Sequence, residues 1–258
     1  MVKERKPQPK EQATGKKKET TMEFIASMAV VLVVGLFIIT FNLQAFEIPS
    51  SSMENTLLIG DHVFVDRVTP APKTSWFPVI PYRSLKRGDI VVFLSPAEPG
   101  LFVVKRVIGV PGDRIHLKDG VLYRNGEKVD EPYIIHSRGD YNPYRDNFPD
   151  VTPMEGTGVT QEWRLTMDSH IENGDLVVPQ DSYFGMGDNR DVSYDSRYWG
   201  FIPKENVVGR PMFIYWSFET PANQYLKTDL GDRLQFIGKV IFHFFDETRW
   251  NRMFRLVK

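Results

Sequence analysis

Residues 101–123 read LFVVKRVIGVPGDRIHLKDGVLY, which is three short apolar runs separated by the turn-forming residues Pro, Gly and Asp. The runs at Leu101–Ile108, Arg114–Leu117 and Gly120–Tyr123 have the length and the β-branched and aromatic content of strands. An Asn-Gly pair at 125–126 follows at once and favours a tight hairpin. This stretch therefore predicts a mainly β fold.

Similar runs continue on both sides of this stretch. They lie at His62–Arg67, Asp89–Leu94, Asp175–Val178 and Val207–Trp216. Between Ile48 and about Gln224 there is no sustained helical period, and no internal repeat is visible. The region is predicted to be one mainly β domain.

Two regions depart from the strand pattern. Residues 130–173 mix polar and aromatic residues and contain several prolines, so we expect an insertion on the surface. From Asp229 to Lys258 apolar residues recur at helical spacing, which predicts a docked amphipathic helix. Basic residues three apart would give that helix a basic edge able to touch lipid head groups, although such an edge is more often solvated. They are Arg249, Arg252, Arg255 and Lys258.

The N-terminal region has a polar tail followed by an uncharged run. From Phe24 to Phe46 there is no charge over 23 residues, and a helix of that length would be about 34 Å long, enough to cross a bilayer. A buried helix of a soluble core is the alternative, but the run has no polar face. Leu43-Gln44-Ala45 lacks the small-x-small pattern of a cleavable signal. We therefore predict an uncleaved transmembrane anchor.

The orientation of the anchor follows from its flanks. Seven Lys and Arg residues precede the run, and the first one after it is Arg67. Because cytoplasmic flanks of membrane helices are enriched in Lys and Arg, the tail is predicted to stay inside and the β domain to lie outside the cytoplasm.

The composition excludes some kinds of chemistry but does not indicate a cellular location. The formal net charge of −1 among 258 residues gives no reason to expect nucleic acid as a partner. The absence of cysteine excludes a thiol nucleophile, a thiolate metal site and a disulfide framework.

A cluster of hydroxyls, Ser50-Ser51-Ser52-Met53, follows the uncharged run. By itself the cluster is more typical of a polar turn begun by Pro49 than of a catalytic site. A serine nucleophile needs a base, and none of the five histidines has a recognisable triad or metal-binding setting.

Lysine is the better candidate base, because burial lowers its pKa. Strand alternation places Lys105 on the same face as Val103 and Val107, where it would be desolvated. Arg106 would lie on the opposite face as a surface or ion-paired arginine.

A third segment, Gly185–Gly200, is dense in Asp, Asn, Arg and Gly and indicates a structured loop. It could be a turn network in which Asp195 and Arg197 pair. A calcium site is the alternative, but the segment lacks the spacing of calcium ligands and carries two arginines.

These three segments, in this order behind an N-terminal anchor, resemble bacterial type I signal peptidases, membrane serine proteases that remove signal peptides from exported preproteins. The resemblance is close over Phe46–Asp61, Arg87–Asp113 and Phe184–Pro203. Its most specific motifs are KRVIGVPGD at Lys105–Asp113 and GDNRD at Gly187–Asp191.

The resemblance implies an antiparallel β catalytic domain with an inserted β-rich subdomain, preceded by one transmembrane helix. On this chain it predicts a cytoplasmic tail at 1–21, an anchor at 22–46 and an extracytoplasmic peptidase domain at 47–258. Within that domain the insertion would span 113–180 and the C-terminal helical segment 229–258.

The resemblance also assigns roles. Ser52 would be the nucleophile and Lys105 the general base, while Ser50 and the backbone N–H of Ser52 would form the oxyanion hole. Ser193 would orient Lys105. The pair Asp195 and Arg197 would support the active-site loop. Two departures stand out, Ser51 between the motif serines and Asn55 where many members have proline; Ser51 leaves open which hydroxyl attacks.

Substrate selection is implied in the same way. Shallow apolar pockets would accept small residues at the first and third positions before the cleaved bond, and the substrate would bind as an added extended strand. The residues that match pocket positions are Phe46, Ile48, Leu57 and Val104. The implied partners are preproteins emerging from the export machinery and the lipid of the bacterial cytoplasmic membrane, with no cofactor and no metal.

Two alternative functions fit these features less well. A self-cleaving repressor shares the serine–lysine dyad, but the anchor and the lack of a DNA-reading helix count against it. A non-catalytic, membrane-anchored β domain that binds envelope proteins would need neither Ser52 nor Lys105.

Overall fold

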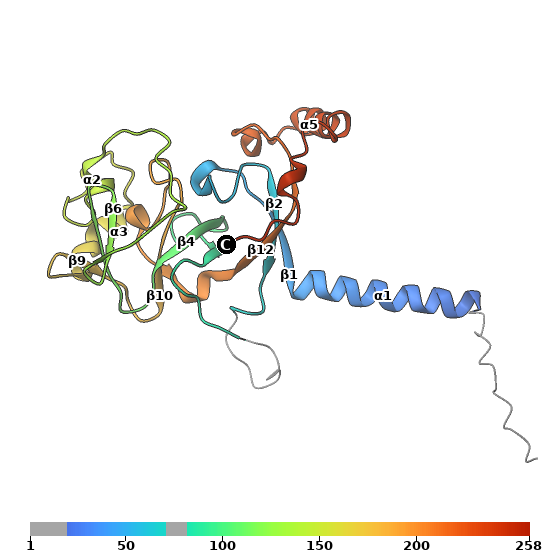
Figure 1. Cartoon of the computed structure of the whole chain (residues 1–258), viewed down its shortest axis with the longest axis horizontal. Helices are drawn as coiled ribbons and strands as arrows, with labels where there is room; N and C mark the ends of the chain where they lie inside the picture. Colours follow the sequence, from blue (N-terminus) through green and yellow to red (C-terminus); the bar gives the residue numbers. More distant parts are fainter. Residues whose placement is uncertain (1–19, 71–81) are drawn as a thin grey trace, which may run out of the picture. The chain divides into compact units, whose positions relative to one another are not determined.

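The computed structural model describes residues 20–70 and 82–258 (Figure 1). The chain divides into two compact units, residues 1–40 and 41–258. Most of the predicted tail lies outside the described residues.

The first unit contains helix α1, Thr21–Phe41. The helix starts with a capping box, because Thr20 donates its backbone N–H to the Glu23 carboxylate at 2.8 Å while the Glu23 N–H donates back to Thr20 Oγ1 at 3.3 Å. The predicted end of the anchor at residue 46 is wrong, since Leu43–Glu47 is strand β1 and pairs with strand β2. Among the residues that the structure describes, no helix combines the length and the apolar character needed to cross a membrane.

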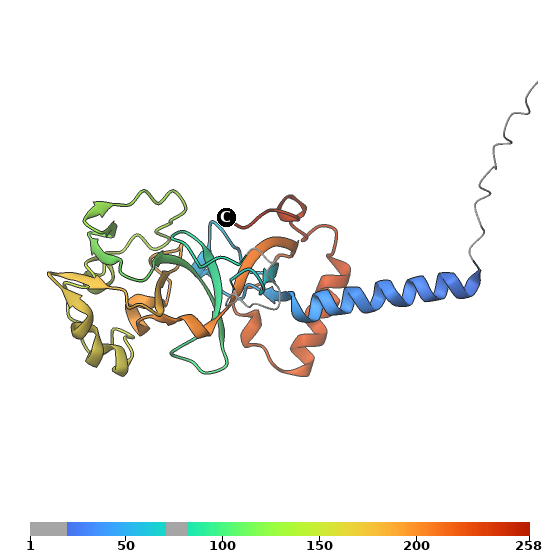
Figure 2. The ribbon, with the colours of Figure 1, turned by 90° about the horizontal axis from the view of Figure 1, so that it is seen from below.

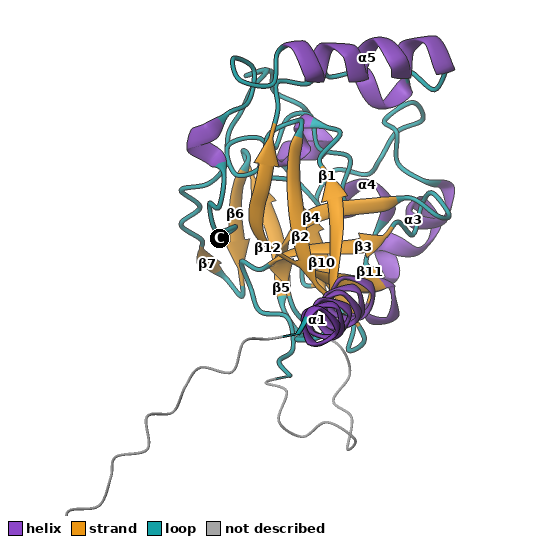
Figure 3. Ribbon diagram, turned by 90° about the vertical axis from the view of Figure 1, so that its right-hand side faces the viewer, coloured by secondary structure: helices purple, strands orange, loops and turns teal. Residues whose placement is uncertain are grey.

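Seven antiparallel strands form the main sheet of the second unit, in the order β1-β2-β12-β3-β4-β10-β11 (Figure 3). The strands beyond β1 are β2 (Asp61–Asp66), β3 (Ile90–Leu94), β4 (Phe102–Gly109), β10 (Ser182–Met186), β11 (Ile202–Pro203) and β12 (Val207–Ser217). In β2 burial alternates strictly, with Val63 and Val65 in the core, as a sheet with one packed face requires. The mainly β, antiparallel fold predicted from the sequence is confirmed.

A second, five-stranded sheet follows the order β7-β6-β5-β9-β8. Its strands are β5 (Arg114–Lys118), β6 (Val121–Arg124), β7 (Glu127–Lys128), β8 (Ile171–Glu172) and β9 (Asp175–Val177). The predicted hairpin at Asn125–Gly126 is confirmed, since both residues have positive φ (55° and 81°) and β6 pairs with β7 across them. Figure 2 shows this sheet, in green and yellow, gathered at one end of the unit.

The expectation that residues 130–173 form a surface insertion is wrong in one respect. The segment holds the short helices α2 (Pro143–Asp146) and α3 (Gln161–Thr166) and adds large side chains to the core of the second sheet. Phe148 and Trp163 are buried there. The prolines end regular elements without removing the segment from the core.

The remaining short elements lie between strands or after the last strand, β12. They are the single-turn 3-10 helices η1 (Ser51–Met53), η2 (Met167–His170), η3 (Lys204–Asn206), η4 (Gln224–Leu226) and η5 (Trp250–Arg252), and the helix α4 (Ser196–Trp199).

The prediction of one amphipathic helix over residues 229–258 is wrong in its extent. Helix α5 spans Leu230–Phe242 only, and beyond η5 the chain runs extended beside β12, with Phe213 bridged to Leu256. Arg252 is buried against Asp61, at 2.6 Å between Nη2 and Oδ2. The basic residues therefore form no common edge.

Candidate active site

The candidate nucleophile lies in the connection between β1 and β2, residues 48–60, whose single turn at Ser51–Met53 is called the nucleophile turn. In this turn the 3-10 helix η1 holds Ser52, and the next residue, Met53, is 1% exposed in a cluster with Ile48 and Leu57. Full burial of one such side chain contributes about 1.5–3 kcal/mol relative to leaving it exposed. The apolar residue after the serine therefore fixes the turn. Asn55, with φ of 85°, then takes a left-handed conformation that proline cannot adopt.

Lys105 reaches this turn from strand β4. Its Nζ lies 2.8 Å from Ser52 Oγ, and the residue is 3% exposed. Burial lowers its pKa to about 8; nearby Asp195 raises it and Arg197 lowers it. A substantial fraction of the amine is therefore neutral near pH 8 and can accept a proton from the hydroxyl.

Ser50 also lies beside the nucleophile. Its Oγ is 3.4 Å from Ser52 Oγ, and its backbone is extended, with φ of −134° and ψ of 160°. The hydrogen bond from Lys105 goes to Ser52 and not to Ser51, which supports the choice of Ser52 made from its position before Met53.

Ser193 is buried in the loop that follows β10. Its Oγ has no hydrogen-bond partner of good geometry among the described residues, although its closeness to Asp195 helps to lower the pKa of that carboxyl. Its predicted contact with Lys105 is therefore not made as a direct hydrogen bond in this structure.

Gly187 is a site residue whose role the sequence did not reveal. A Cβ added there would overlap both Ser193 Oγ and the carbonyl oxygen of Ser52. Glycine is therefore required just after the end of β10, where the chain passes between Ser193 and the carbonyl of Ser52.

Asp195 and Arg197 form a fully buried ion pair behind this loop. The Arg197 Nη2 and Asp195 Oδ2 atoms are 2.8 Å apart. Burial alone would raise the pKa of Asp195, but the Arg197 guanidinium and hydrogen bonds, including one from the Gly187 N–H, hold it below its usual value. The pair thus ties the loop to the backbone of Gly187, directly after β10.

A second set of buried contacts involves Asp188, Asn189 and Arg190 and supports the nucleophile turn. Arg106 forms an ion pair with Asp188 at 2.7 Å, as one of the two settings expected for it. The Asn189 N–H donates to the Ser52 carbonyl at 3.1 Å. Arg190 pairs with Glu131 of the insertion at 2.6 Å. These partners come from segments far apart in sequence, so the sequence alone did not pair them.

Known proteins match most of the length of this chain in sequence. A sequence model of the family described as "Signal peptidase, peptidase S26" matches residues 21–216.

The chain belongs to the signal peptidase S26 family.

Individual relatives agree with this assignment. Signal peptidase I of Rickettsia typhi is 32% identical over 225 residues, covering 78% of this chain and 83% of the relative. Signal peptidase I of Bacillus licheniformis is 34% identical over 221 residues, covering 85% of this chain and 99% of the relative. A solved signal peptidase I from Enterococcus faecalis is 31% identical and covers 50% of this chain and 97% of its own, with a TM-score of 0.37.

The four residues predicted from the resemblance to line substrate pockets lie in one apolar cluster. Ile48 and Leu57 are 3% and 0% exposed, and Phe46 and Val104 pack against the same cluster while half-buried. The cluster also contains Met53, so it adjoins the nucleophile turn.

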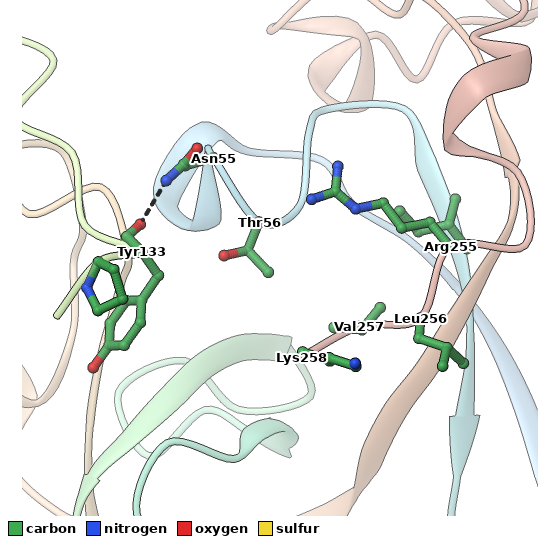
Figure 4. Close-up of a pocket in the computed structure, with 9 residues that line it drawn as sticks. Asn55, Thr56, Tyr133, Arg255, Leu256, Val257 and Lys258 are labelled. Atoms are coloured by element: carbon green, nitrogen blue, oxygen red, sulfur yellow. Dashed lines mark hydrogen bonds between the residues drawn. The ribbon is translucent and has the colours of Figure 1, made fainter.

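A cavity of about 550 Å³ borders the chain just after the nucleophile turn, at Asn55 and Thr56 (Figure 4). It is lined by Asn55 and Thr56, by Tyr133 of the insertion and by the segment Arg255–Lys258. Neither Ser52 nor Lys105 lines it. The Asn55 side chain donates to the Tyr133 carbonyl at 3.0 Å across one edge. In the described part of the chain, no three His, Asp or Glu side chains gather as a metal site.

Proposed function

We propose that this chain is a type I signal peptidase, a serine endopeptidase that uses Lys105 as its base. The observation that carries the proposal is the distance of 2.8 Å between Lys105 Nζ and Ser52 Oγ, made by a lysine that is almost fully buried. A buried lysine beside an uncharged hydroxyl would be a costly structural feature without a chemical use.

The reaction would proceed through an acyl-enzyme. The neutral amine of Lys105 takes the proton of Ser52 as its Oγ attacks the carbonyl carbon of the scissile bond. The negative oxygen that forms accepts hydrogen bonds from the Ser50 hydroxyl and the Ser52 N–H. When the C–N bond breaks, Lys105 returns the proton to the leaving amine. A water molecule then hydrolyses the Ser52 ester, with Lys105 again as the base.

The substrates would be preproteins with small residues at the first and third positions before the cleaved bond. The apolar cluster of Phe46, Ile48, Leu57 and Val104 beside the nucleophile turn supports this selection, because apolar side chains would receive small apolar groups. Signal peptides in an extended conformation would bind by main-chain hydrogen bonds, while the two pockets choose the residues.

The enzyme would act at the outer side of the bacterial cytoplasmic membrane, with its N-terminus inside. The uncharged run at 24–46 and the basic residues that precede it support this location. Preproteins would reach the site as they leave the export machinery. Alkaline extraction of membranes, with and without residues 1–41, tests the attachment; release of the full chain by the extraction would contradict it.

The activity is tested by incubating the purified full chain with a preprotein that carries an Ala-x-Ala site. The cleavage site is identified by mass spectrometry. Ser52→Ala and Lys105→Ala should each abolish cleavage, while Ser51→Ala serves as the matched control and should cleave normally. Normal turnover by Ser52→Ala together with loss in Ser51→Ala would move the nucleophile by one residue.

A further inference from the structure

Helix α5 has its apolar face directed away from the domain that carries it. Leu230, Leu234, Ile237 and Ile241 recur at helical spacing and are 74%, 60%, 53% and 68% exposed. Residues four, seven and eleven positions after the first lie on one face of a helix. No residue of α5 is buried against any described part of the chain.

The opposite face of α5 makes the contacts with the domain. The Phe236 ring lies 6.2 Å from that of Phe218, and Lys239 pairs with Glu247 at 2.6 Å. Figure 3 shows α5 as a separate helix beyond the ends of β2 and β12. An ordinary surface helix faces its apolar side to the core. The reversed arrangement leaves an apolar stripe, formed by Leu230, Leu234, Ile237 and Ile241, without a partner among residues 20–70 and 82–258.

Exposed aromatic residues lie near both ends of the helix in sequence. Tyr225 precedes it at 57% exposed, Phe242 is its last residue at 86% exposed, and Phe245 follows at 81% exposed. Trp250, 48% exposed, stacks on Phe245 with ring centroids 6.4 Å apart. Aromatic residues at the ends of an aliphatic stripe are typical of helices that lie in the interface of a bilayer.

A second copy of the chain fits this surface less well. A helix of 13 residues is about 20 Å long, and its stripe offers far fewer than the roughly 20–30 residues that each side of a stable interface contributes. A lipid surface needs no complementary shape, and the chain's proposed place is already at a membrane.

The charges on α5 define the kind of lipid. Within the helix Asp232 opposes Arg233 and Lys239, and Lys239 is already paired with Glu247. The helix therefore carries little net charge for anionic lipid to attract. Burial of apolar area would have to supply the binding, which would then depend little on salt.

We propose that α5 lies in the plane of the bilayer interface, with its apolar stripe among the lipid acyl chains and zwitterionic lipid sufficient to hold it. The inference rests on the membrane location in the proposed function. It makes α5 a second membrane contact of the catalytic domain, separate from the residues 24–46.

The absence of cysteine from the chain allows a direct test with single introduced cysteines. The full chain, carrying Ile237→Cys or Leu234→Cys labelled with an environment-sensitive fluorophore, is reconstituted in phosphatidylcholine vesicles. The matched controls are Asp232→Cys, on the face toward the domain, and Glu127→Cys, exposed in the second sheet. The same samples are repeated with a nitroxide-labelled phosphatidylcholine.

The expected result is blue-shifted emission and quenching by the nitroxide lipid at positions 234 and 237, with neither at 232 or 127. The signal should persist at about 1 M salt, where the Debye length falls to about 3 Å, and should not change when protein is diluted at constant lipid. Flotation of the vesicles separates the two claims. Protein that floats without the shift at 237 overturns the α5 inference alone, and protein that does not float overturns both claims. A shift lost on dilution of protein would assign the stripe to a second copy and overturn the inference.

Discussion

Arg190 and Glu131 form a bidentate ion pair in the interior, with Arg190 Nη1 and Nη2 at 2.9 and 2.6 Å from the two carboxylate oxygens. Both side chains are nearly fully buried, at 2% and 3% exposed. The pair joins the insertion to the loop whose Asn189 supports the carbonyl of Ser52. The insertion and the nucleophile turn are therefore held as one structure.

Removal of one partner should destabilise the fold strongly. Glu131→Ala or Arg190→Ala leaves a buried charge unpaired and is expected to cost about 3–5 kcal/mol. The measurement is denaturant unfolding of the purified chain. The control is Glu172→Ala, because the Arg114–Glu172 pair is exposed, at 30% and 65%, and such pairs contribute about 0–1 kcal/mol. If the Glu131 and Glu172 variants lost equal free energy of unfolding, the burial of the Arg190–Glu131 pair would not contribute to its stability.

The lowered pKa of Lys105 predicts how the rate depends on pH. Only the neutral amine accepts the serine proton, so kcat/KM should rise with pH and level off above a midpoint at about 8. Ser50→Ala should be slower with the same midpoint, because it leaves the base intact. A midpoint near 10.5, the ordinary lysine value, would contradict a desolvated base.

The same lowered pKa predicts a pH-dependent stability. Between about pH 8 and 10.5 the unfolded chain binds a proton at this lysine that the folded chain does not, so stability from this group rises with pH across that window. Below it the folded state carries the full cost, about 3 kcal/mol for the difference between pKa values of about 8 and 10.5. Lys105→Met removes this cost.

Paired unfolding experiments check this second consequence. Lys105→Met should exceed the wild type in free energy of unfolding at pH 7, and the excess should shrink as the pH approaches 10.5. The difference between the two chains cancels the titration of all other groups. A variant less stable than the wild type at every pH would mean that packing of the lysine outweighs its desolvation.

The close approach at Gly187 predicts a specific catalytic loss. Gly187→Ala introduces a Cβ that overlaps Ser193 Oγ and the carbonyl of Ser52, so one of them must move. A displacement of about 1 Å at a reacting group can cost about 10²-fold in rate. The measurement is kcat on a preprotein, with Gly231→Ala as the control, because a Cβ there would meet no described atom within 4 Å apart from its chain neighbours and its own helix backbone. If Gly187→Ala were as active as Gly231→Ala, the site would tolerate a Cβ at position 187.

The sequence predicted the strands well where apolar and turn residues alternate, as at β2, β4 and β12. It missed β1, because Leu43–Glu47 continues an uncharged run and composition alone does not show where a helix ends and a strand begins. Burial of Phe148 and Trp163 depends on the second sheet, which local pattern does not reveal.

The candidate site shows the same division between local and distant information. The valine-lined face of Lys105 follows from strand alternation, whereas the pairing of Arg252 with Asp61 joins residues 191 positions apart. Arg252 therefore looked like part of a helical basic edge. Gly187 lies within the segment Gly185–Gly200 that the sequence singled out. The lack of room for a Cβ at Gly187 arises only in the folded chain, where the residue meets Ser193 and Ser52.

Ser50 is the remaining group with a distinct expected effect. Its hydroxyl lies 3.4 Å from Ser52 Oγ and is proposed to donate to the oxyanion. Removing one such donor typically lowers kcat by about 10²–10³, and KM should change little because the oxyanion is absent from the bound substrate. Single-turnover cleavage by Ser50→Ala, compared with Ser50→Thr and Ser51→Ala, measures this. Thr keeps a hydroxyl and should recover part of the rate, while Ser51→Ala should match the wild type. If Ser50→Ala also cleaves at the wild-type rate, Ser50 only shapes the turn and the oxyanion is stabilised by backbone N–H groups.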